Sequence, residues 1–412
     1  MQIDLSGKSV LLGVTGSISA YKACDVARLF IKAGASVHVV MTPSAERFVS
    51  LLTFEALTRN AVLTESTESW SSELNHIDIG KKCDAFIIAP ATANTLNKMR
   101  QGLADNILTQ TFLAFKGPIL VAPAANTQML AHPTSRQSLS LLEAQGYSVI
   151  TPQEKLLACG DVGAGALADP SEIFFETAKA LLKEDFWTNR PVIVTGGGSR
   201  EKIDEVRYIS NFSSGKMAKS LCLALYLKGA KVHYIHSMGA EDLPLNITSE
   251  SFEDAEGLLM RTQKVINDHT ANTKTPYLFM VAAVADFKPT SPQKGKVKKA
   301  SLGESWSIEL TQTPDILSSL KRNHIKTIAF KAEMDSKEGL NNAINLLRQK
   351  QVDAVCYNLL QDAKSFGGDE NEITFISKNA QISLGRSDKL GLSHKIVSEA
   401  KKLSSTQGSN GE

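Results

Sequence analysis

The sequence predicts an α/β protein built from two Rossmann-like three-layer domains. Short apolar runs, typical of buried parallel strands, alternate with longer segments of helical period along the chain. The two halves of the chain also begin with similar segments. Residues 9–16 (SVLLGVTG) and 191–198 (PVIVTGGG) both have the pattern of a strand that ends in Thr-Gly. Residues 33–40 and 228–235 share Gly-Ala-x-Val-His. This echo indicates two related α/β units rather than a short-period repeat.

The length and composition allow at least two hydrophobic cores. At roughly 150 residues per domain, 412 residues suggest two or three domains, and 42% of the residues are hydrophobic. The formal net charge of +2 argues against binding nucleic acid through bulk electrostatics, so any anion site must be local. The five cysteines form no Cys-x-x-Cys pair, so neither a disulfide framework nor a zinc site is indicated.

The N-terminal segment does not have the pattern of a secretory signal, and no apolar run reaches the ~20 residues that span a bilayer. Scattered free cysteines suit a reducing compartment. A cytoplasmic protein without a membrane partner is therefore expected.

Five strands are expected in the first half. They cover 9–15, 36–42, 84–90, 118–124 and 147–151. The helices with the clearest period cover 18–34, 133–146 and about 171–184, and glycine ends the first two. Residues 184–191 (EDFWTNRP), where a proline restarts a strand, are the predicted linker. The predicted domains are 1–188 and 189–403, followed by a polar tail, 404–412, that is expected to be disordered.

The second half repeats this pattern with an insertion. Strands are expected at 191–198, 277–283, 327–332 and 353–358, an antiparallel hairpin at 372–385, and helices at 216–230 and about 388–403. Thr15 and Gly34 are 19 residues apart and Thr195 and Gly229 are 34 apart, so the second unit carries 34 − 19 = 15 extra residues. They lie in 199–215 (SREKIDEVRYISNFSSG), at the sheet edge where ligands bind.

The loop after the first strand is a candidate phosphate site. Gly16, Ser17 and Ile18 open a helix whose free N–H groups favour an anion, although Ser17 is equally suited to cap an ordinary turn. The dinucleotide pattern G-x-G-x-x-G is absent, and the second strand ends in Met41-Thr42 rather than in an acidic residue that grips a ribose. These features argue against NAD and leave a mononucleotide, with Thr42 beside it.

Two further loops carry polar side chains at the same sheet edge. Thr92, Ala93, Asn94 and Thr95 follow the third strand, and helix capping needs only one of their polar groups. Asn126 follows the fourth strand. Because the carboxyl ends of parallel strands meet at one edge, the three loops are expected to form one pocket that fits FMN.

His76 and Cys159 are the candidate chemical residues of the first half. A lone histidine is more often a satisfied or solvent-facing side chain, so the residue type alone leaves the role of His76 open. Cys159 lies in a glycine-rich stretch, 158–167 (ACGDVGAGAL), whereas the other cysteines fall in or beside predicted helices and strands. A flexible segment suits closure over a substrate, so Cys159 is predicted to be chemical.

These residues occur within motifs that resemble the flavin-containing cysteine decarboxylases. The motifs are GSISAYKA (16–23), PATANT (90–95), GLADN (102–106), PAAN (123–126) and ACGD (158–161), together with His76. The resemblance is closest to the phosphopantothenoylcysteine decarboxylase half of the bifunctional coenzyme A biosynthesis proteins. It implies a flavodoxin-like flavoprotein of the homo-oligomeric type with FMN as its cofactor.

The resemblance also implies a role for each residue. His76 becomes the substrate-proximal base, Asn126 the group that binds the cysteine-derived carboxylate, and Cys159 the proton donor of a flap. The implied chemistry is oxidation of the substrate's cysteinyl unit by the flavin, loss of CO₂, and return of hydride and proton. The family pattern is not kept at three positions, which carry Ala125, Leu130 and Ala166.

The insertion of the second half is not a P-loop. The motif G-x-x-x-x-G-K-[ST] fails because Ser210 replaces its first glycine and Met217 follows Gly215-Lys216. A long polar surface loop is the simplest interpretation, but its cation, amide and hydroxyl groups favour phosphate and acyl binding. The residues concerned are Arg207, Asn211, Ser213, Ser214 and Lys216.

Two other segments of the second half suit a nucleotide. Asp286 follows the buried run MVAAVA at the ligand edge of the sheet. Lys294, Lys296 and Lys298 alternate in 294–299 (KGKVKK), which composition alone assigns to a solvated edge strand. A triphosphate, however, needs such a local cation cluster in a nearly neutral protein.

Motifs along the second half resemble the phosphopantothenate–cysteine ligase half of the same proteins. They are 195–217, AAVADFKP (282–289), KVKK (296–299), TPDIL (313–317), AFKAE (329–333) and FGGDEN (366–371). By this resemblance the nucleotide, CTP, contacts Ala282, Asp286, Lys296, Thr313, Pro314, Asp315, Ile316, Phe330 and Lys350. Asn211 assists an acyl-cytidylate intermediate, and Mg²⁺ is required without assigned ligands. Departures from the family are Thr313, Lys331 and Leu346.

The resemblance makes the substrates 4′-phosphopantothenate, cysteine and CTP, and it implies a homo-oligomer without nucleic acid or membrane as a partner. Some relatives of the decarboxylase are flavin-binding regulatory or scaffold subunits, and related flavin folds are prenyltransferases. Retention of His76, Asn126 and Cys159 argues against a non-catalytic binder, and the second half argues against a prenyltransferase. The alternative kept open is that only the ligase half is active.

Overall fold

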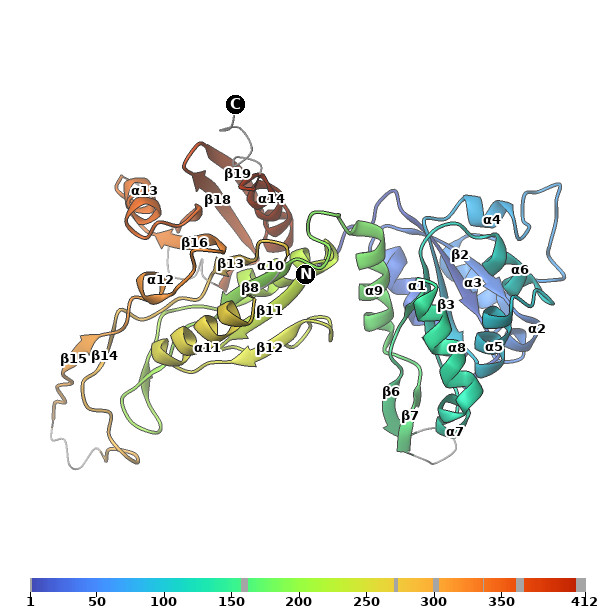
Figure 1. The fold of residues 1–412 in the computed structure, drawn as a ribbon, viewed down its shortest axis with the longest axis horizontal. Helices are drawn as coiled ribbons and strands as arrows, with labels where there is room; N and C mark the ends of the chain where they lie inside the picture. Colours follow the sequence, from blue (N-terminus) through green and yellow to red (C-terminus); the bar gives the residue numbers. More distant parts are fainter. Residues whose placement is uncertain are drawn as a thin grey trace. The chain divides into compact units, whose positions relative to one another are not determined.

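A computed structural model describes residues 2–156, 162–269, 273–298, 304–335, 337–360 and 367–404. The chain divides into two compact units, Gln2–Leu182 and the part that begins at Lys183 (Figure 1). Each unit is a mostly parallel sheet with helices packed on it, so the predicted α/β fold class is confirmed. In the described part of the chain, no helix is both long and apolar enough to cross a membrane.

The first unit contains a five-stranded parallel sheet. Its strands are β1 (Ser9–Val14), β2 (Ser36–Met41), β3 (Ala85–Ala91), β4 (Ile119–Pro123) and β5 (Ser148–Val149). They are arranged in the order β2-β1-β3-β4-β5, which is the order of flavodoxin-like sheets. Strand β2 is added on one side of β1, and β3 and the later strands are added on the other side. In such sheets a crevice opens at the carboxyl ends of the two strands at this switch point, β1 and β3. The five predicted strands and this fold are confirmed.

Helices cover both faces of this sheet. They are η1 (Ile18–Tyr21), α1 (Lys22–Lys32), α2 (Pro43–Glu46), α3 (Leu51–Thr58), α4 (Asp78–Lys81), α5 (Ala93–Gln101), α6 (Ile107–Ala114), α7 (Thr127–Ala131), α8 (Pro133–Ala144) and α9 (Pro170–Leu182). Helices α1 and α9 pack together, as do α5 and α8. The helix predicted at 18–34 thus begins with a 3₁₀ turn, because Ser17 caps η1 before α1 starts.

The glycine-rich stretch predicted to be flexible is partly a strand. Strand β7 (Val162–Ala166) pairs antiparallel with β6 (Gln153–Leu156) to form a hairpin. Small residues hid this strand from sequence reasoning, since Val-Gly-Ala-Gly-Ala carries almost no apolar signal. Cys159 lies between the two strands, outside the described residues.

The second unit contains an eight-stranded sheet. Its parallel strands are β8 (Pro191–Gly196), β11 (Lys231–His236), β12 (Thr248–Ser251), β13 (Tyr277–Met280), β16 (Lys326–Glu333) and β17 (Ala354–Leu359). They are arranged in the order β12-β11-β8-β13-β16-β17, which is the Rossmann order. The switch point lies between β8 and β13, because the strands that follow β8 are added first on one side of it and then on the other. The predicted hairpin, β18 (Glu370–Ser377) and β19 (Gln381–Asp388), extends the sheet antiparallel to β17. The exposed, polar edge strand β12 gave no apolar signal and was not predicted.

The helices of the second unit are α10 (Lys216–Leu227), α11 (Ala255–Asp268), α12 (Ile316–Ser319), α13 (Gly339–Gln349) and α14 (Lys389–Lys402). Helices α10 and α14 pack side by side (Figure 1). Two small ribbons project from the sheet: β9 (Glu201–Lys202) with β10 (Tyr208–Ile209), and β14 (Phe287–Pro289) with β15 (Leu310–Gln312). The described part of 294–299 lies in the loop after β14, so the edge strand considered for these lysines is wrong.

The predicted linker, 184–191, is a packed part of the second unit. Trp187 is fully buried, and its ring contacts Phe186 and Tyr277 edge-to-face at centroid distances of 4.9 and 5.0 Å. The carboxylate of Glu184 pairs with Lys228 at 2.7 Å. The aromatic residues of this short segment therefore belong to the core of the second unit, and the segment is not a flexible linker. The predicted disordered tail lies outside the described residues from 405 onward.

Candidate active sites

The first pocket is a cavity of about 830 Å³ in the first unit. It opens at the carboxyl ends of β1, β3 and β4, where the strand order reverses. All predicted cofactor residues line it: Gly16, Ser17, Ile18, Thr42, Thr92, Ala93, Asn94 and Thr95. Asn126 lines the same cavity. The sheet thus brings together loops that are far apart in the sequence.

The loop after β1 is held close to its neighbours. A Cβ atom on Gly16 would lie 2.5 Å from the Cβ of Ser44, so only glycine fits there. Ser17 Oγ accepts a hydrogen bond from the Ser19 N–H at 3.3 Å and therefore caps η1. The Thr15 hydroxyl donates to the Pro90 carbonyl at 2.7 Å and accepts from the Thr92 N–H at 3.1 Å, which ties the first loop to the loop after β3.

Helix capping uses only part of the polar loop after β3. Thr92 Oγ1 accepts from the Thr95 N–H at 3.3 Å and caps α5. Thr42 caps α2 in the same way, through the Ala45 N–H at 3.3 Å. The side chain of Asn94 is exposed and lines the cavity. Asn94 is thus the polar group of this loop that is presented to a ligand.

Strand β7 forms one wall of the first pocket next to Asn126. Asn126 Oδ1 accepts from the Gln128 N–H at 2.8 Å and caps α7. The Ala125 N–H donates to the Gly165 carbonyl at 3.1 Å, and a Cβ on Gly165 would lie 2.2 Å from the Ala125 carbonyl oxygen. The bare backbone of β7 can therefore lie directly against the Asn126 turn.

Two of the three departures from the family pattern lie in the first pocket. Ala125 and Ala166 line the cavity, where small side chains leave additional volume. Leu130 is buried among the apolar side chains of the core and does not line the cavity. The first two positions therefore bear on ligand shape, and the third bears on packing.

Sequence reasoning missed an ion pair at the rim of this cavity. Lys98 Nζ lies 2.6 Å from Asp105 Oδ2, and both residues line the pocket. The hydrogen bond from Lys98 holds the pKa of Asp105 below its usual value. Lys98 follows Asn94 by one helical turn, and this spacing was the signal that could have revealed it.

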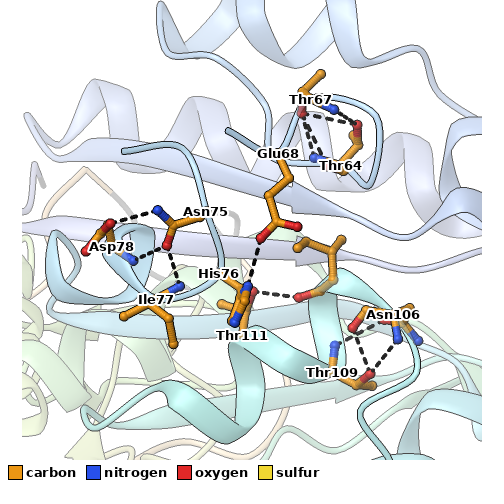
Figure 2. A network of polar contacts seen from close by, with 11 residues as sticks. Thr64, Thr67, Glu68, Asn75, His76, Ile77, Asp78, Asn106, Thr109 and Thr111 are labelled. Atoms are coloured by element: carbon orange, nitrogen blue, oxygen red, sulfur yellow. Dashed lines mark hydrogen bonds and ion pairs between the residues drawn. The ribbon is translucent and has the colours of Figure 1, made fainter. Parts of the chain in front are cut away.

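His76 does not line the first pocket. Its Nδ1 lies 2.8 Å from Glu68 Oε1 (Figure 2). Trp70 contacts its ring edge-to-face at 5.6 Å. Asn75 fixes the turn by accepting from the N–H groups of Ile77 and Asp78 at 3.0 and 2.9 Å. A carboxylate only accepts, so Nδ1 carries a proton and Nε2 of the neutral ring is left as an acceptor. This is the tautomer that a general base needs.

The second pocket, of about 580 Å³, lies in the second unit at the carboxyl ends of β8, β13, β16 and β17. Six predicted site residues line it: Asn211, Ser213, Ser214, Lys216, Ala282 and Phe330. The Asn211 amide donates to the Val284 carbonyl at 2.8 Å, which anchors the inserted loop across the strand ends. In both units the pocket thus lies at the carboxyl ends of the parallel strands, at the switch point of the sheet.

The lining of the second pocket is basic. Among its described residues it carries Lys216, Lys331 and Lys389 but no aspartate or glutamate. Lys216 Nζ lies 2.6 Å from Asp369 Oδ1, and this hydrogen bond lowers the pKa of the Asp369 carboxyl group. Lys331 pairs with Glu333 at 3.2 Å. Two of the three ammonium groups are thus ion-paired, and the pocket suits a negatively charged ligand.

Arg207 has a structural partner instead of a place in the second pocket. Its Nε donates to Asp204 Oδ2 at 3.0 Å and its Nη2 donates to the Val297 carbonyl at 2.9 Å. The guanidinium also lies over the Trp306 ring at 4.5 Å. The hydrogen bond from Arg207 holds the pKa of the Asp204 carboxyl group well below its usual value. These contacts fasten the β14–β15 ribbon to the inserted loop.

Seven predicted nucleotide residues lie outside the lining of the second pocket. They are Asp286, Lys296, Thr313, Pro314, Asp315, Ile316 and Lys350. The Thr313 hydroxyl donates to the Ala285 carbonyl at 2.6 Å, and Lys350 forms an ion pair with Asp315. Ile316 is buried in the core. Of the nine predicted nucleotide contacts, the structure brings Ala282 and Phe330 into this pocket.

Known proteins match the chain along nearly its whole length. The family model "Flavoprotein" matches residues 2–182, and "DNA/pantothenate metabolism flavoprotein C-terminal domain" matches 187–403. The coenzyme A biosynthesis bifunctional protein CoaBC of Haemophilus influenzae is 35% identical over 402 residues, 96% of this chain and 98% of the relative. The CoaBC protein of Bacillus subtilis is 36% identical over 414 residues, 98% of this chain and 99% of the relative.

A solved C-terminal domain of a CoaBC protein is 26% identical, covers 54% of this chain and all of that chain, and has a TM-score of 0.44. The two full-length relatives, at 35% and 36% identity, place the chain in the family of coenzyme A biosynthesis bifunctional proteins.

Proposed function

We propose that the protein catalyses two consecutive steps of coenzyme A biosynthesis. Cysteine is ligated to 4′-phosphopantothenate with CTP through an acyl-cytidylate, and the product, 4′-phospho-N-pantothenoylcysteine, is decarboxylated to 4′-phosphopantetheine. The second unit, which begins at Lys183, is the ligase domain, and the first unit, Gln2–Leu182, is the FMN-dependent decarboxylase domain. The observation that carries this proposal is that each sheet has its own pocket at its switch point, lined in part by polar side chains.

The first pocket fits FMN. Gly16 packs so closely against Ser44 that no Cβ fits there, which holds the loop after β1 at the pocket. The strand order is that of flavodoxin-like proteins, and about 830 Å³ accommodates a mononucleotide beside a substrate. Ser17 and its neighbours would hold the phosphate, and Thr42, Thr92, Asn94 and the adjoining backbone would hold the remainder. When bound, FMN supplies the oxidation of the substrate and the return of hydride.

The chain supplies binding and proton transfer for the decarboxylation. Asn126 holds the substrate carboxylate at the floor of the first pocket, beside β7. His76, with Nδ1 oriented by Glu68, accepts a proton at Nε2. Cys159, which lies outside the described residues, is assigned the return of a proton.

The second pocket suits the ligation. The carboxylate of 4′-phosphopantothenate attacks the α-phosphorus of CTP and displaces pyrophosphate, and the amine of cysteine then attacks the acyl carbon and releases CMP. Asn211 contacts the activated acyl group, Ser213, Ser214 and Lys216 contact the acyl substrate, and Ala282 and Phe330 contact the nucleotide. Mg²⁺ commonly binds proteins through substrate phosphates, so it is assigned to the phosphates of CTP.

We further propose that the protein is a cytoplasmic homo-oligomer. His76 lies outside the lining of the first pocket of its own subunit. Its ring contacts Trp70, whose side chain is 65% exposed. Assembly of several copies buries such a side chain and gives His76 a partner surface.

The experiment is a complete reaction followed by mass spectrometry. Purified protein is incubated with 4′-phosphopantothenate, cysteine, CTP and Mg²⁺, and 4′-phosphopantetheine with release of CO₂ is expected. A visible flavin spectrum of the purified protein gives an independent check on the first unit. Accumulation of phosphopantothenoylcysteine without CO₂ would leave the ligase alone active, with the first unit a flavin-binding regulatory or scaffold domain.

A further inference from the structure

A buried lysine of the second pocket has no role in the ligation described above. Lys389 is the first residue of α14 and lines the cavity, yet it is only 6% exposed. Its ammonium donates to the carbonyl oxygen of Gly368. Within the described ranges it forms no ion pair. Lysine is rarely buried without a carboxylate partner, because desolvation of the ammonium is costly.

Lys389 and Lys216 hold the same short segment from two sides. Lys216 Nζ donates to the Gly367 carbonyl at 3.0 Å and to Asp369 Oδ1 at 2.6 Å. The backbone N–H of Lys389 donates to the Asp369 carbonyl at 3.1 Å. Burial lowers the pKa of the Lys389 ammonium, the charge of Lys216 lowers it further, and the charge of Asp369 raises it. Both ammonium groups donate to backbone carbonyls of the same segment, 367–369, at one end of the pocket.

The single carboxylate of this cluster offsets only one of the two positive charges. Asp369 has a side chain that is 87% exposed, so water already solvates it. Two cations with one solvated anion leave an excess positive charge. Lys389 is buried, whereas the side chain of Lys216 is 48% exposed, so the charge on Lys389 is the one that water solvates poorly. A ligand that brings at least one further negative charge would restore the balance.

The start of α10 adds a second, independent feature at the same place. Helix α10 is twelve residues long and begins after Gly215, whose φ is 68°, without a side-chain cap. The first N–H groups of such a helix favour an anion.

We propose that Lys389 and Lys216 form a two-lysine clamp that binds a phosphate group of a ligand in the second pocket. This inference deepens the proposed ligation and rests on it. A phosphate matches the site because its oxygens accept from two ammonium groups and from helix N–H groups together. Lysine acts on phosphate as a point charge and needs no planar geometry. The phosphate comes either from CTP or from 4′-phosphopantothenate.

The test compares charge-removing and charge-keeping variants in the full-length protein. Lys389→Gln keeps a donor for the Gly368 carbonyl but removes the charge, whereas Lys389→Arg keeps the charge. The matched control is Lys395→Gln, because Lys395 lies on the same helix, donates to the Leu384 carbonyl at 2.8 Å and does not line the pocket. Calorimetry measures the affinity for CTP, and the ligase assay measures kcat and the Michaelis constant for the phosphopantothenate substrate.

Lys389→Gln should weaken one ligand by about 10-fold or more, as expected for loss of a charge-assisted contact. A weaker affinity for CTP identifies the nucleotide phosphates as the occupant, and a higher Michaelis constant for the phosphopantothenate substrate alone identifies the substrate phosphate. Lys389→Arg should weaken the same ligand less, and Lys395→Gln should match the wild type. Thermal melts followed by circular dichroism show whether each variant folds, and Lys389→Met replaces Lys389→Gln if the amide prevents folding.

Two outcomes overturn the clamp. Either both ligands bind Lys389→Gln as they bind the wild type, or Lys389→Gln and Lys389→Arg lose binding equally, which indicates a packing role only. Failure of the proposed function looks different, because wild-type protein would then neither bind CTP nor form phosphopantothenoylcysteine.

Discussion

At the scale of single residues, the contact between His76 and Glu68 decides what the histidine can do. The carboxylate fixes the tautomer in which Nε2 is the acceptor, at an Nδ1–Oε1 distance of 2.8 Å (Figure 2). The residue type alone did not reveal this, since a lone histidine is compatible with several roles. The partner lies in a separate turn, which Thr64 and Thr67 stabilise by hydrogen bonds.

The Glu68→Gln variant tests this dyad. Decarboxylation of supplied phosphopantothenoylcysteine should fall in kcat by about 10² or more, the lower end of what a positioned base contributes. Ligation should be unchanged. Glu73→Gln is the control, because Glu73 lies in the same loop and pairs with Lys82 at 3.1 Å instead. Equal kcat values for Glu68→Gln and wild type would remove Glu68 from the mechanism.

The Asn211→Asp variant tests the second pocket. An aspartate cannot donate to the Val284 carbonyl, and it adds a negative charge where the substrate is anionic. Amide formation should fall by about 10² or more, in the range seen when a preorganised donor is removed. Mass spectrometry of the ligase reaction should show acyl-cytidylate accumulating, while supplied phosphopantothenoylcysteine is still decarboxylated. Loss of both activities together would mean that the residue is only structural.

At the scale of elements, β7 is one of the strands that sequence reasoning overlooked. Its glycines allow the backbone to approach α7, and a Cβ on Gly163 would lie 2.2 Å from Thr127 Oγ1. Residues without side chains give no periodicity, so only the tertiary contact explains why they are there.

Gly165→Ala should displace β7 from the Asn126 turn. The new Cβ would lie 2.2 Å from the Ala125 carbonyl oxygen, so the strand must move and the bond from the Ala125 N–H must lengthen. The first unit should lose about 1–3 kcal/mol of unfolding free energy, and the Michaelis constant for phosphopantothenoylcysteine should rise. Ala164→Ser, on the exposed side of the same strand, is the control. Urea melts measure the unfolding free energy, and decarboxylase kinetics measure the Michaelis constant. Wild-type values of both for Gly165→Ala would contradict the proposal that close packing of β7 shapes the first pocket.

The β14–β15 ribbon should loosen in acid. The pKa of the Asp204 carboxyl group is lower in the folded protein than in the unfolded chain because of Arg207. Its contribution to stability is therefore present above about pH 4, the ordinary pKa of aspartate, and is lost as the pH falls further. Trp306, which packs on Arg207, reports this by fluorescence. Asp204→Asn should show the Trp306 fluorescence of the loosened ribbon already at neutral pH. If the fluorescence of wild type and Asp204→Asn changed with pH in the same way, Asp204 would not hold the ribbon.

At the scale of the whole molecule, two units with related sheets carry separate pockets. The order of strands in each sheet selects which loops meet, and this order is not written in any local pattern. Predicted residues on neighbouring strand ends, such as Ser17 and Asn94, therefore share a pocket. Arg207 was predicted to bind substrate from its residue type, but its partners Asp204 and Val297 became visible only in the fold.

Trp70→Ala tests the proposed homo-oligomer. Removal of a side chain that is 65% exposed should not destabilise an isolated subunit, but it should weaken an interface that buries the ring. Light scattering with size-exclusion chromatography is expected to show a smaller species, with decarboxylation reduced because His76 is adjacent. Trp70→Phe should restore both. An unchanged mass and activity for Trp70→Ala would exclude this surface from the interface.

The sequence by itself determined the fold class, the positions of most strands, the two ligand edges and the family. Buried parallel strands are apolar runs, and the loops that follow them carry the polar groups, so these features are local. The tertiary structure alone decided that Lys216 and Lys389 lie at one end of the same pocket and that His76 pairs with Glu68. Such pairs join distant segments, and their distances depend on sheet order and helix packing, which no short stretch of sequence specifies.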